Sequence, residues 1–305
     1  MAKILLTGAA GFLGRECMRQ FKETGYDVVT TDRLGEVDYI GDLSDVAFCA
    51  HLPNADAVVH CAAVQYVSAD LPLFFRDAYF EKNNVAATRN LCQRYANAST
   101  HFVHVGTSMM YLQNGAEEYS PASPMRGQGV YSISKLNAQK FVDALDNPTA
   151  TVIPCIIGGI GREGLFRGFV RHMQRFGMVV YPGAGSHKVH MVHVEDVAGL
   201  IVCIVNAGAT GKFNAAAPNP LSIEQWVDEM QDELSLPKIR RLHVPLAPIQ
   251  FLSRVLGYRL LAREQLLMLG LKHTLSTKEA TDIGWTARHD NKTIVRDIAR
   301  HISSS

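Results

Sequence analysis

Apolar runs alternate with amphipathic stretches along the first half of the chain, which predicts alternating strands and helices. The runs KILLTG, YDVVTTD, ADAVVHCAA, HFVHVGTS and ATVIPCIIGG have the length and β-branched content of buried strands. RECMRQFKETG has helical spacing and ends at Gly25, and two further helical stretches cover 84–98 and 131–145. This alternation is typical of a doubly wound parallel α/β sheet with helices on both faces, which binds ligands outside the carboxyl ends of its strands.

The pattern loosens after about Gly159. Residues 161–177 have helical spacing, 179–188 have the composition of a loop, and 192–205 predict a strand followed by a helix. The tail from Pro218 is mostly helical. We therefore expect two domains that are interleaved in the sequence. A dinucleotide-binding α/β domain would comprise 1–158 and 189–214, and a smaller, mainly helical substrate domain would comprise 159–188 and 215–305.

Composition and charge exclude several classes of function. The chain has 305 residues, 47% of them hydrophobic, and a net charge of +1 without a basic stripe, so we expect a globular protein that does not bind nucleic acid. No run approaches the roughly 18 apolar residues of a membrane span. The N-terminal stretch MAKILLTGAA predicts an immediate strand and no signal peptide, so we expect a cytoplasmic protein.

Cysteine and histidine spacing gives no indication of a disulfide framework or a metal site. The six cysteines are scattered through mostly apolar runs, which favours free thiols in a reducing compartment. The twelve histidines lack H-E-x-x-H or Cys/His spacing, so we expect no metal.

A glycine-rich turn, TGAAGFLG, follows the first expected strand directly. Gly8 permits a tight turn, Gly11 lets the backbone approach a pyrophosphate, and Gly14 lets the following helix pack close to the sheet. The position of the motif in a strand–turn–helix unit is the context that a dinucleotide-binding site requires. We therefore expect this turn to bind NAD or NADP.

Acidic residues at the ends of the next two strands favour NAD. Asp32 ends the second strand, where a carboxylate accepts hydrogen bonds from a ribose 2′-hydroxyl and repels a 2′-phosphate. Arg33 follows at once and offers a partner for such a phosphate, so NADP stays possible. Asp42, in GDLSD, is expected near the adenine at the end of a third strand.

A tyrosine and a lysine four residues apart, Tyr131 and Lys135, begin the helical stretch 131–145. Residues at this spacing share one helix face. A nearby ammonium group lowers a tyrosine pKa that starts near about 10, which makes the phenol a usable general acid/base. The pattern is common by chance, so its chemistry depends on the rest of the chain.

Taken together, these motifs resemble the extended short-chain dehydrogenases/reductases of the NAD-dependent epimerase/dehydratase family. TGAAGFLG, Asp32, GDLSD, VVHCAA, NNVAATRNL, GTSMMY, YSISK and VHVEDVA occur in that family's order. NPLSIEQW, the PLAP joint and STKEATDIGW extend the likeness over nearly the whole chain. The resemblance implies a Rossmann fold with a smaller substrate domain, and an NAD(P)-dependent enzyme.

The resemblance also assigns roles to single residues. It implies that Tyr131 is the catalytic acid/base and that Lys135 lowers its pKa and binds the nicotinamide ribose. The catalytic hydroxyl would come from Thr107 or from Ser108, and Asn84 would help to hold the active-site helix. The remaining cofactor contacts would be made by Ala10, Phe12, Leu13, Leu43, Cys61, Ala62, Ala63, Pro154 and Ile157. Family members often form homodimers through the helices that begin near Asn84 and Tyr131.

Departures from the family pattern bear on the reaction. In 4,6-dehydratases the catalytic threonine is followed by Asp and Glu, whereas this chain has Ser108 and Met109. Because methionine cannot transfer a proton, this argues against dehydration. The segment after the sixth strand, IPCIIGG, has Ile156 where nucleotide-sugar epimerases carry an asparagine. It is more similar to dihydroflavonol reductases and 3β-hydroxysteroid dehydrogenases.

The arginine with which epimerases clamp a nucleotide diphosphate is replaced by Val189. Lys188 and His187 are adjacent, but a lysine lacks the bidentate fork of an arginine. The apolar stretch 251–270 would line a pocket for a hydrophobic substrate or form domain core, and core is the favoured interpretation.

Three functions remain open. The first is a dehydrogenase that acts on a secondary alcohol or ketone of a small non-nucleotide substrate. The second is a nucleotide-sugar epimerase with an altered diphosphate site. The third is a non-catalytic dinucleotide sensor, against which the intact Tyr131–Lys135 pair argues.

Overall fold

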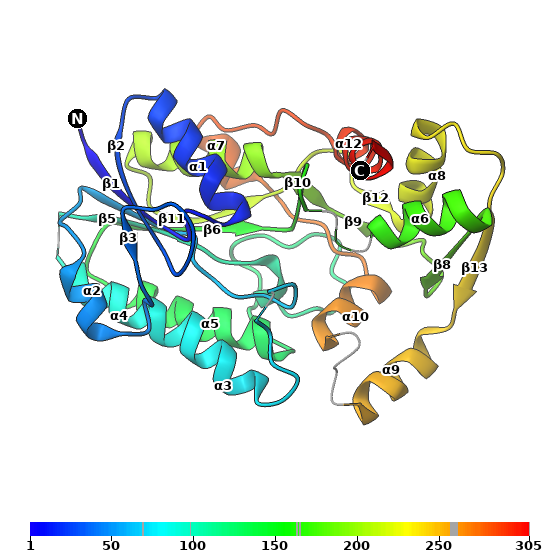
Figure 1. Cartoon of the computed structure of the whole chain (residues 1–305), viewed down its shortest axis with the longest axis horizontal. Coiled ribbons are helices and arrows are strands. Elements are labelled where there is room, and N and C mark those ends of the chain that lie inside the picture. The colour runs from blue at the N-terminus through cyan, green and yellow to red at the C-terminus, as the bar shows by residue number, and fades with distance from the viewer. Residues whose placement is uncertain (69, 98, 163, 165, 257–261, 305) are drawn as a thin grey trace.

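A seven-stranded parallel sheet forms the centre of the computed structural model, which describes the chain except residues 69, 98, 163, 165, 257–261 and 305 (Figure 1). The strand order is β11-β6-β5-β4-β1-β2-β3. The strands are β1 (Lys3–Thr7), β2 (Asp27–Asp32), β3 (Tyr39–Ile40), β4 (Ala57–His60), β5 (His101–Val105), β6 (Thr149–Pro154) and β11 (Gly211–Ala215). The chain runs outward from β1 in both directions, which creates a topological switch point between β1 and β4. This arrangement confirms the expected doubly wound Rossmann fold.

Helices cover both faces of the sheet (Figure 1). One face carries α1 (Phe12–Glu23) and α7 (Val194–Ala207), and the other carries α2 (Val46–His51), α4 (Ala87–Arg94) and α5 (Val130–Asp143). The apolar sides of α1 and α7 pack on the sheet through residues such as Phe21, Leu200 and Ile204, none of which is solvent-exposed. Both sheet faces are therefore buried, as the near-continuous apolar strand sequences require.

The helix expected over 84–98 begins earlier and is not uniformly α-helical. It starts as α3 (Arg76–Phe80), continues through a π-helical segment η1 (Glu81–Ala86), and then becomes α4. Such π segments inside helices occur frequently at functional sites. The side chain of Asn84 is buried within this segment.

The smaller region lies beyond the carboxyl ends of the strands and contains more strand than the sequence indicates. Its elements are α6 (Phe166–Phe176), β8 (Met178–Pro182), β9 (Lys188–Val189), β12 (Leu221–Ser222), α8 (Ile223–Glu233), β13 (Arg240–Val244), α9 (Leu246–Val255), α10 (Arg263–Gly270) and α12 (Asn291–Ser304). The prediction of a loop over 179–188 was wrong, because β8 pairs in parallel with β13. That pairing joins segments far apart in the sequence, so no local pattern reveals it. A further short pair joins β7 (Ile156–Gly158) to β10 (Met191–His193).

The two regions have separate hydrophobic cores. The smaller region has its own core around Trp226, Phe169 and Ile298. Ala280, in α11 (Lys278–Asp282), and Trp285 belong instead to the core of the main sheet, although both lie within 215–305. The domain boundaries at 158, 189 and 214 stay a prediction.

Two further observations bear on the broad class of protein. No helix in the described part of the chain is both long and apolar enough to cross a bilayer. All six cysteines are free thiols, as their spacing predicts.

Two neighbouring histidines, His60 on β4 and His104 on β5, are buried in the central sheet. The His60 ring is hydrogen-bonded to the hydroxyls of Thr7 (2.7 Å) and Thr88 (2.9 Å). The His104 ring lies 5.4 Å from the His60 ring, and neither of its nitrogens has a partner among the described residues. Burial lowers the pKa of His60 to about 3 and the pKa of His104 well below its ordinary 6.5. Both rings are therefore neutral in the folded protein.

These depressed pKa values predict a loss of stability on acidification. As pH falls below the ordinary histidine pKa of 6.5, the unfolded chain takes up protons that the folded protein excludes. The substitution His104→Leu puts an apolar side chain of similar size in the same place. In this variant we expect the unfolding free energy to decrease less steeply with falling pH, by up to about 1.4 kcal/mol per pH unit. Urea unfolding between about pH 7 and pH 5 measures this slope.

The control is His51→Leu, which changes an exposed histidine on α2 and leaves the slope as it is in the wild type. Equal slopes in the wild type and His104→Leu would contradict the assignment of His104 as a neutral buried ring.

Candidate active site

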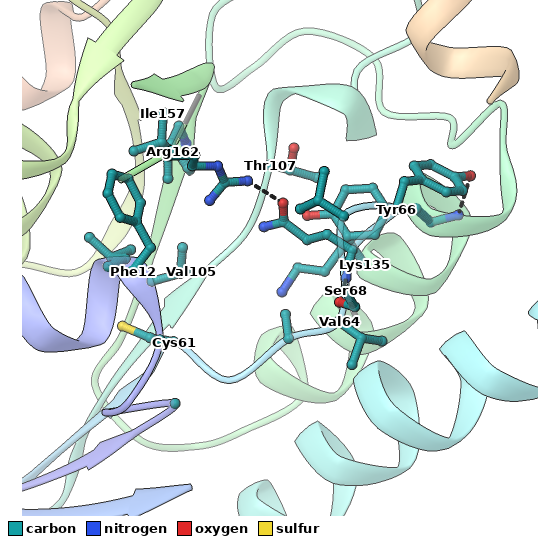
Figure 2. Close-up of a pocket in the computed structure, with 18 of the residues that line it drawn as sticks. Phe12, Cys61, Val64, Tyr66, Ser68, Val105, Thr107, Lys135, Ile157 and Arg162 are labelled. Atoms are coloured by element: carbon teal, nitrogen blue, oxygen red, sulfur yellow. Dashed lines mark hydrogen bonds between the residues drawn. The ribbon is translucent and has the colours of Figure 1, made fainter. Parts of the chain in front are cut away.

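A cavity of about 880 Å³ opens at the carboxyl ends of the central strands (Figure 2). Its walls come from the turns after β1, β4, β5 and β6, from α5, and from the smaller region. Because parallel strands end at one edge of the sheet, these turns meet although they are far apart in the sequence.

The glycine turn has the tight geometry that its sequence predicts. Gly8 has a φ of +68°, and a Cβ there would lie 2.6 Å from the backbone nitrogen of Ala62. A Cβ on Gly14 would lie 2.0 Å from the carbonyl oxygen of Gly8. The N-cap of α1 is Gly11, so no side chain caps the first N–H groups of this helix. Free N–H groups at a helix N-terminus, beside an open cavity, fit the pyrophosphate of a dinucleotide.

The two strand-end carboxylates lie beside this turn. Asp32 accepts hydrogen bonds from the backbone N–H groups of Ala10 (3.0 Å) and Arg33 (2.7 Å), which fix it against the glycine turn. The Arg33 guanidinium pairs with Asp70 at 3.2 Å and donates to Asn83 at 2.9 Å. Asp42 accepts from the N–H of Ser44 and pairs with Lys82 at 3.0 Å.

Most residues that the sequence assigns to cofactor binding line the cavity. They are Gly8, Gly11, Phe12, Leu13, Asp32, Arg33, Asp42, Leu43, Cys61, Ala62, Ala63, Tyr131, Lys135, Pro154 and Ile157. Ala10 does not line the cavity, but it belongs to the glycine turn through its bond to Asp32. Asn84 also lies outside the lining.

Asn84 connects two segments that line the site, α5 and the turn after β4, through hydrogen bonds of its side chain. Its amide donates to the Ser134 hydroxyl on α5 at 2.9 Å, and its side-chain oxygen accepts from the N–H of Val64 at 2.9 Å. This contact agrees with the expectation that Asn84 positions the active-site helix.

Tyr131 and Thr107 face each other at the floor of the cavity. Tyr131 is 6% exposed and Thr107 8% exposed. Burial raises the pKa of Tyr131 to about 12, while the nearby Arg162 guanidinium and Thr107 hydroxyl act in the opposite direction. The phenol is therefore protonated at neutral pH. The expected lowering of the Tyr131 pKa by Lys135 stays a prediction.

The side chain of Lys135 points into the cavity (Figure 2). Lys135 is 2% exposed, and its ammonium group makes no hydrogen bond or ion pair with the described residues. Burial lowers its pKa to about 8. A buried ammonium without a partner, across the cavity from the glycine turn, fits a sugar hydroxyl of a dinucleotide bound there.

The structure places the two candidate hydroxyls differently. The Thr107 hydroxyl is near Tyr131 and accepts from the N–H of Met109, so it also caps the short helix η2 (Ser108–Met110). The Ser108 hydroxyl is hydrogen-bonded to Nε2 of His273 at 2.8 Å. Thr107 is therefore the hydroxyl that lies beside the phenol.

Four further residues surround Tyr131 that no sequence motif identifies. Arg162 and Gln65 line the cavity and are hydrogen-bonded to each other. Tyr66 accepts from the N–H of Tyr131 at 3.2 Å and donates to Glu264 at 3.0 Å. Glu264, in α10, also accepts from the N–H of Ser132 at 3.2 Å. It serves as an acceptor for the first turn of α5, whose own N-cap, Gly129, has no side chain.

Part of the cavity wall is apolar. Val189 and Ile156, which stand in place of family polar residues, both line it, together with Trp226 and Met268. Ala262, Gln265 and Met268 show that the apolar tail contributes to the wall as well as to core. Within that tail, 257–261 lie outside the described residues.

In the described part of the chain, one group of side chains lies close enough together to hold a metal ion. The ligand atoms of His193, Glu195 and His289 lie within 4.8 Å of one another, outside the lining of the cavity. His289 is already hydrogen-bonded to the buried carboxylate of Asp196 at 3.0 Å. The expectation of no metal stays a prediction.

Comparison with known proteins gives the family and the fold. The model of the NAD dependent epimerase/dehydratase family matches residues 4–216, more than half of the chain. One relative is the decarboxylating sterol-4-alpha-carboxylate 3-dehydrogenase of Dictyostelium discoideum, 23% identical, with 65% of this chain and 66% of that protein covered. Another is the 2-alkyl-3-oxoalkanoate reductase of Stenotrophomonas maltophilia, 24% identical, with 78% and 77% covered.

Among solved structures, MoeE5 in complex with UDP-glucuronic acid and NAD is similar throughout. It has 21% sequence identity and a TM-score of 0.78, and the match covers 99% of each chain. At this identity the likeness shows a shared fold.

The crowding at Gly14 predicts a selective loss of dinucleotide binding. A Cβ there meets backbone, which cannot move without displacing the glycine turn. We expect Gly14→Ala to weaken NADH binding at least tenfold, measured by fluorescence titration. The matched control is Gly168→Ala, because that glycine lies in α6 with open space around it. Unchanged NADH affinity in Gly14→Ala would contradict the role of this turn.

Proposed function

The chain belongs to the NAD-dependent epimerase/dehydratase family, and on this premise we propose that it is a dehydrogenase that exchanges a hydride between NAD(P) and a secondary alcohol or ketone. It is an enzyme of the short-chain dehydrogenase/reductase superfamily, as the sequence motifs predict. The substrate that we propose is a small molecule without a nucleotide. Tyr131 is the proposed acid/base, Thr107 the hydroxyl that orients the substrate oxygen, and Lys135 the group that binds the nicotinamide ribose.

The observation that carries this proposal is the buried, protonated Tyr131 beside Thr107 in the cavity. When bound, a reduced nicotinamide supplies the hydride. The Tyr131 hydroxyl then donates its proton to the substrate oxygen, and the Thr107 hydroxyl stabilises the charge that develops on that oxygen. A raised tyrosine pKa keeps the acid form, which donates the proton in ketone reduction, available at neutral pH.

The environment of Asp32 supports NAD as the cofactor. Its carboxylate is fixed beside the glycine turn, where it would accept from a ribose 2′-hydroxyl. Arg33 is engaged with Asp70 and Asn83, so binding a 2′-phosphate would require breaking both contacts. We therefore propose NAD, with NADP as the weaker ligand.

The character of the outer cavity supports a substrate without a nucleotide. Val189, Ile156 and Trp226 offer a diphosphate no charged partner. The names of the two relatives describe oxidation or reduction at carbon 3 of compounds that carry a carboxylate. The alternative is a nucleotide-sugar epimerase, and its support is the fold shared with MoeE5, which was solved with UDP-glucuronic acid and NAD.

A homodimer through α4 and α5 and a cytoplasmic location stay predictions. Ile133 and Phe141 on α5 are 46% and 36% exposed, which suits a helix face that packs on a second copy.

The positions of the two hydroxyls predict unequal effects on catalysis. We expect Thr107→Ala to lower kcat at least 100-fold, because the hydroxyl beside the reacting oxygen is lost. Ser108→Ala is the matched control, since its hydroxyl is directed to His273, and should lower kcat less than tenfold. Steady-state NADH oxidation with a panel of ketones measures both. Equal losses would contradict the assignment of Thr107.

Cofactor exchange separates the dehydrogenase from the epimerase. A dehydrogenase releases its nucleotide in each turnover, so we expect protein purified without added cofactor to contain little nucleotide and to bind NADH reversibly. Denaturation followed by chromatography of the supernatant measures the bound fraction. Near-stoichiometric NAD or NADH would favour the epimerase, which closes its redox cycle in one site.

A further inference from the structure

Arg162 is the cation nearest to the proposed acid/base that no motif identifies. It follows β7 and lines the cavity on the side of Phe12 and Ile157, across from Thr107 and Lys135 (Figure 2). Its guanidinium donates to the side-chain oxygen of Gln65 and lies 5.6 Å from the centre of the Phe12 ring. It also interacts electrostatically with Tyr131.

The positive charge of Arg162 is not neutralised by any described residue. No described carboxylate forms a salt bridge with it, and its hydrogen-bond partner, the Gln65 amide, is neutral. Burial lowers its pKa, which reflects the cost of removing this charge from water. Other arginines in the lining have partners of their own, since Arg33 pairs with Asp70 and Arg76 donates to the Pro72 carbonyl.

We propose that Arg162, with Gln65, binds a carboxylate of the substrate, and that the substrate is a 3-oxo acid or the corresponding 3-hydroxy acid. This inference rests on the proposed function. A guanidinium presents two parallel N–H donors that match a carboxylate, and pairing is strongest where water is excluded. Arg162 and Tyr131 line the same cavity and interact electrostatically, so a carboxylate bound to Arg162 would lie on the side of the cavity that faces the oxygen protonated by Tyr131. A carboxylate that is separated from the carbonyl carbon by a single carbon atom, as in a 3-oxo acid, meets this condition.

The reaction balances on this substrate without a further reactant. The carbonyl carbon accepts the hydride of the reduced nicotinamide, its C=O π bond opens, and the oxygen takes the Tyr131 proton. The products are a 3-hydroxy acid and the oxidised cofactor, and Tyr131 regains a proton from solvent. The carboxylate stays paired with Arg162 throughout. The remaining part of the substrate extends along Val189, Trp226 and Met268, which suits an alkyl chain or an apolar ring.

The rival role for Arg162 is a clamp on the cofactor pyrophosphate, because Phe12 opens α1 next to the glycine turn. The two roles differ in which ligand loses affinity when the guanidinium is removed.

The test compares 3-oxooctanoate with its methyl ester, which differ in one charge at the same position. With the wild type and NADH, we expect kcat/KM for the acid to exceed that for the ester at least 100-fold. Arg162→Gln should lower kcat/KM for the acid at least 30-fold more than it lowers kcat/KM for the ester, and leave the Kd of NADH unchanged. Arg162→Lys should be intermediate, because it keeps the charge and loses the fork.

A second measurement needs no turnover. In the presence of NAD, 3-hydroxyoctanoate should raise the Tm of the wild type and not that of Arg162→Gln, since a ligand stabilises only the protein that binds it. A weakened Kd for NADH in Arg162→Gln, with equal losses on acid and ester, overturns the proposal in favour of the pyrophosphate clamp.

The failure of this inference and the failure of the proposed function give different results. A wild type that reduces the ester as well as the acid overturns the carboxylate site and leaves the dehydrogenase intact. A wild type that binds NADH but reduces neither these two compounds nor 2-heptanone contradicts the dehydrogenase, and the carboxylate site with it.

Discussion

The parallel register of β1, β4, β5 and β6 is the constraint on which the site depends. Each strand ends at the same edge, so the turn after β1, Cys61 after β4, Thr107 after β5 and Ile157 after β6 meet around one cavity. A shift of one residue in any strand would turn its buried side chains toward the other face of the sheet. Apolar side chains on both faces of these strands pack against helices, which holds this register.

The second determinant of the site is the burial of charge. Lys135 and Arg162 bring two cationic groups into a cavity that contains the Tyr131 phenol. The buried carboxylate of Glu264 lies outside the cavity lining, and its Oε1 accepts from Tyr66 and from the first turn of α5. The cavity therefore carries more positive than negative charge at its floor. Such an environment suits anionic ligands and an oxyanion that develops during reaction. The distant elements α10 and η1 fix this arrangement, through Glu264 and Asn84 respectively.

The sequence predicts those site residues whose positions depend on their spacing within one strand–turn–helix unit or within one helix. Gly8, Gly14 and Asp32 follow strands at fixed spacings, so their positions could be derived from the strand–turn–helix pattern. Tyr131 and Lys135 share a helix face, which four-residue spacing alone determines. Arg162, Gln65 and Glu264 could not be predicted, because long-range packing brings them to Tyr131 from segments with no motif. Burial raises the pKa of Tyr131 and the nearby Arg162 acts in the opposite direction, and neither effect follows from the spacing of residues in the sequence.

The most direct test of the account follows the hydride itself. NADH that carries deuterium at both positions of nicotinamide C4 is incubated with the enzyme, 3-oxooctanoate and a UDP-sugar, and the products are analysed by mass spectrometry. The account predicts 3-hydroxyoctanoate with one deuterium on the carbinol carbon, and no labelled product with Tyr131→Phe. A nucleotide sugar epimerised without deuterium uptake, beside an unreacted keto acid, would contradict it.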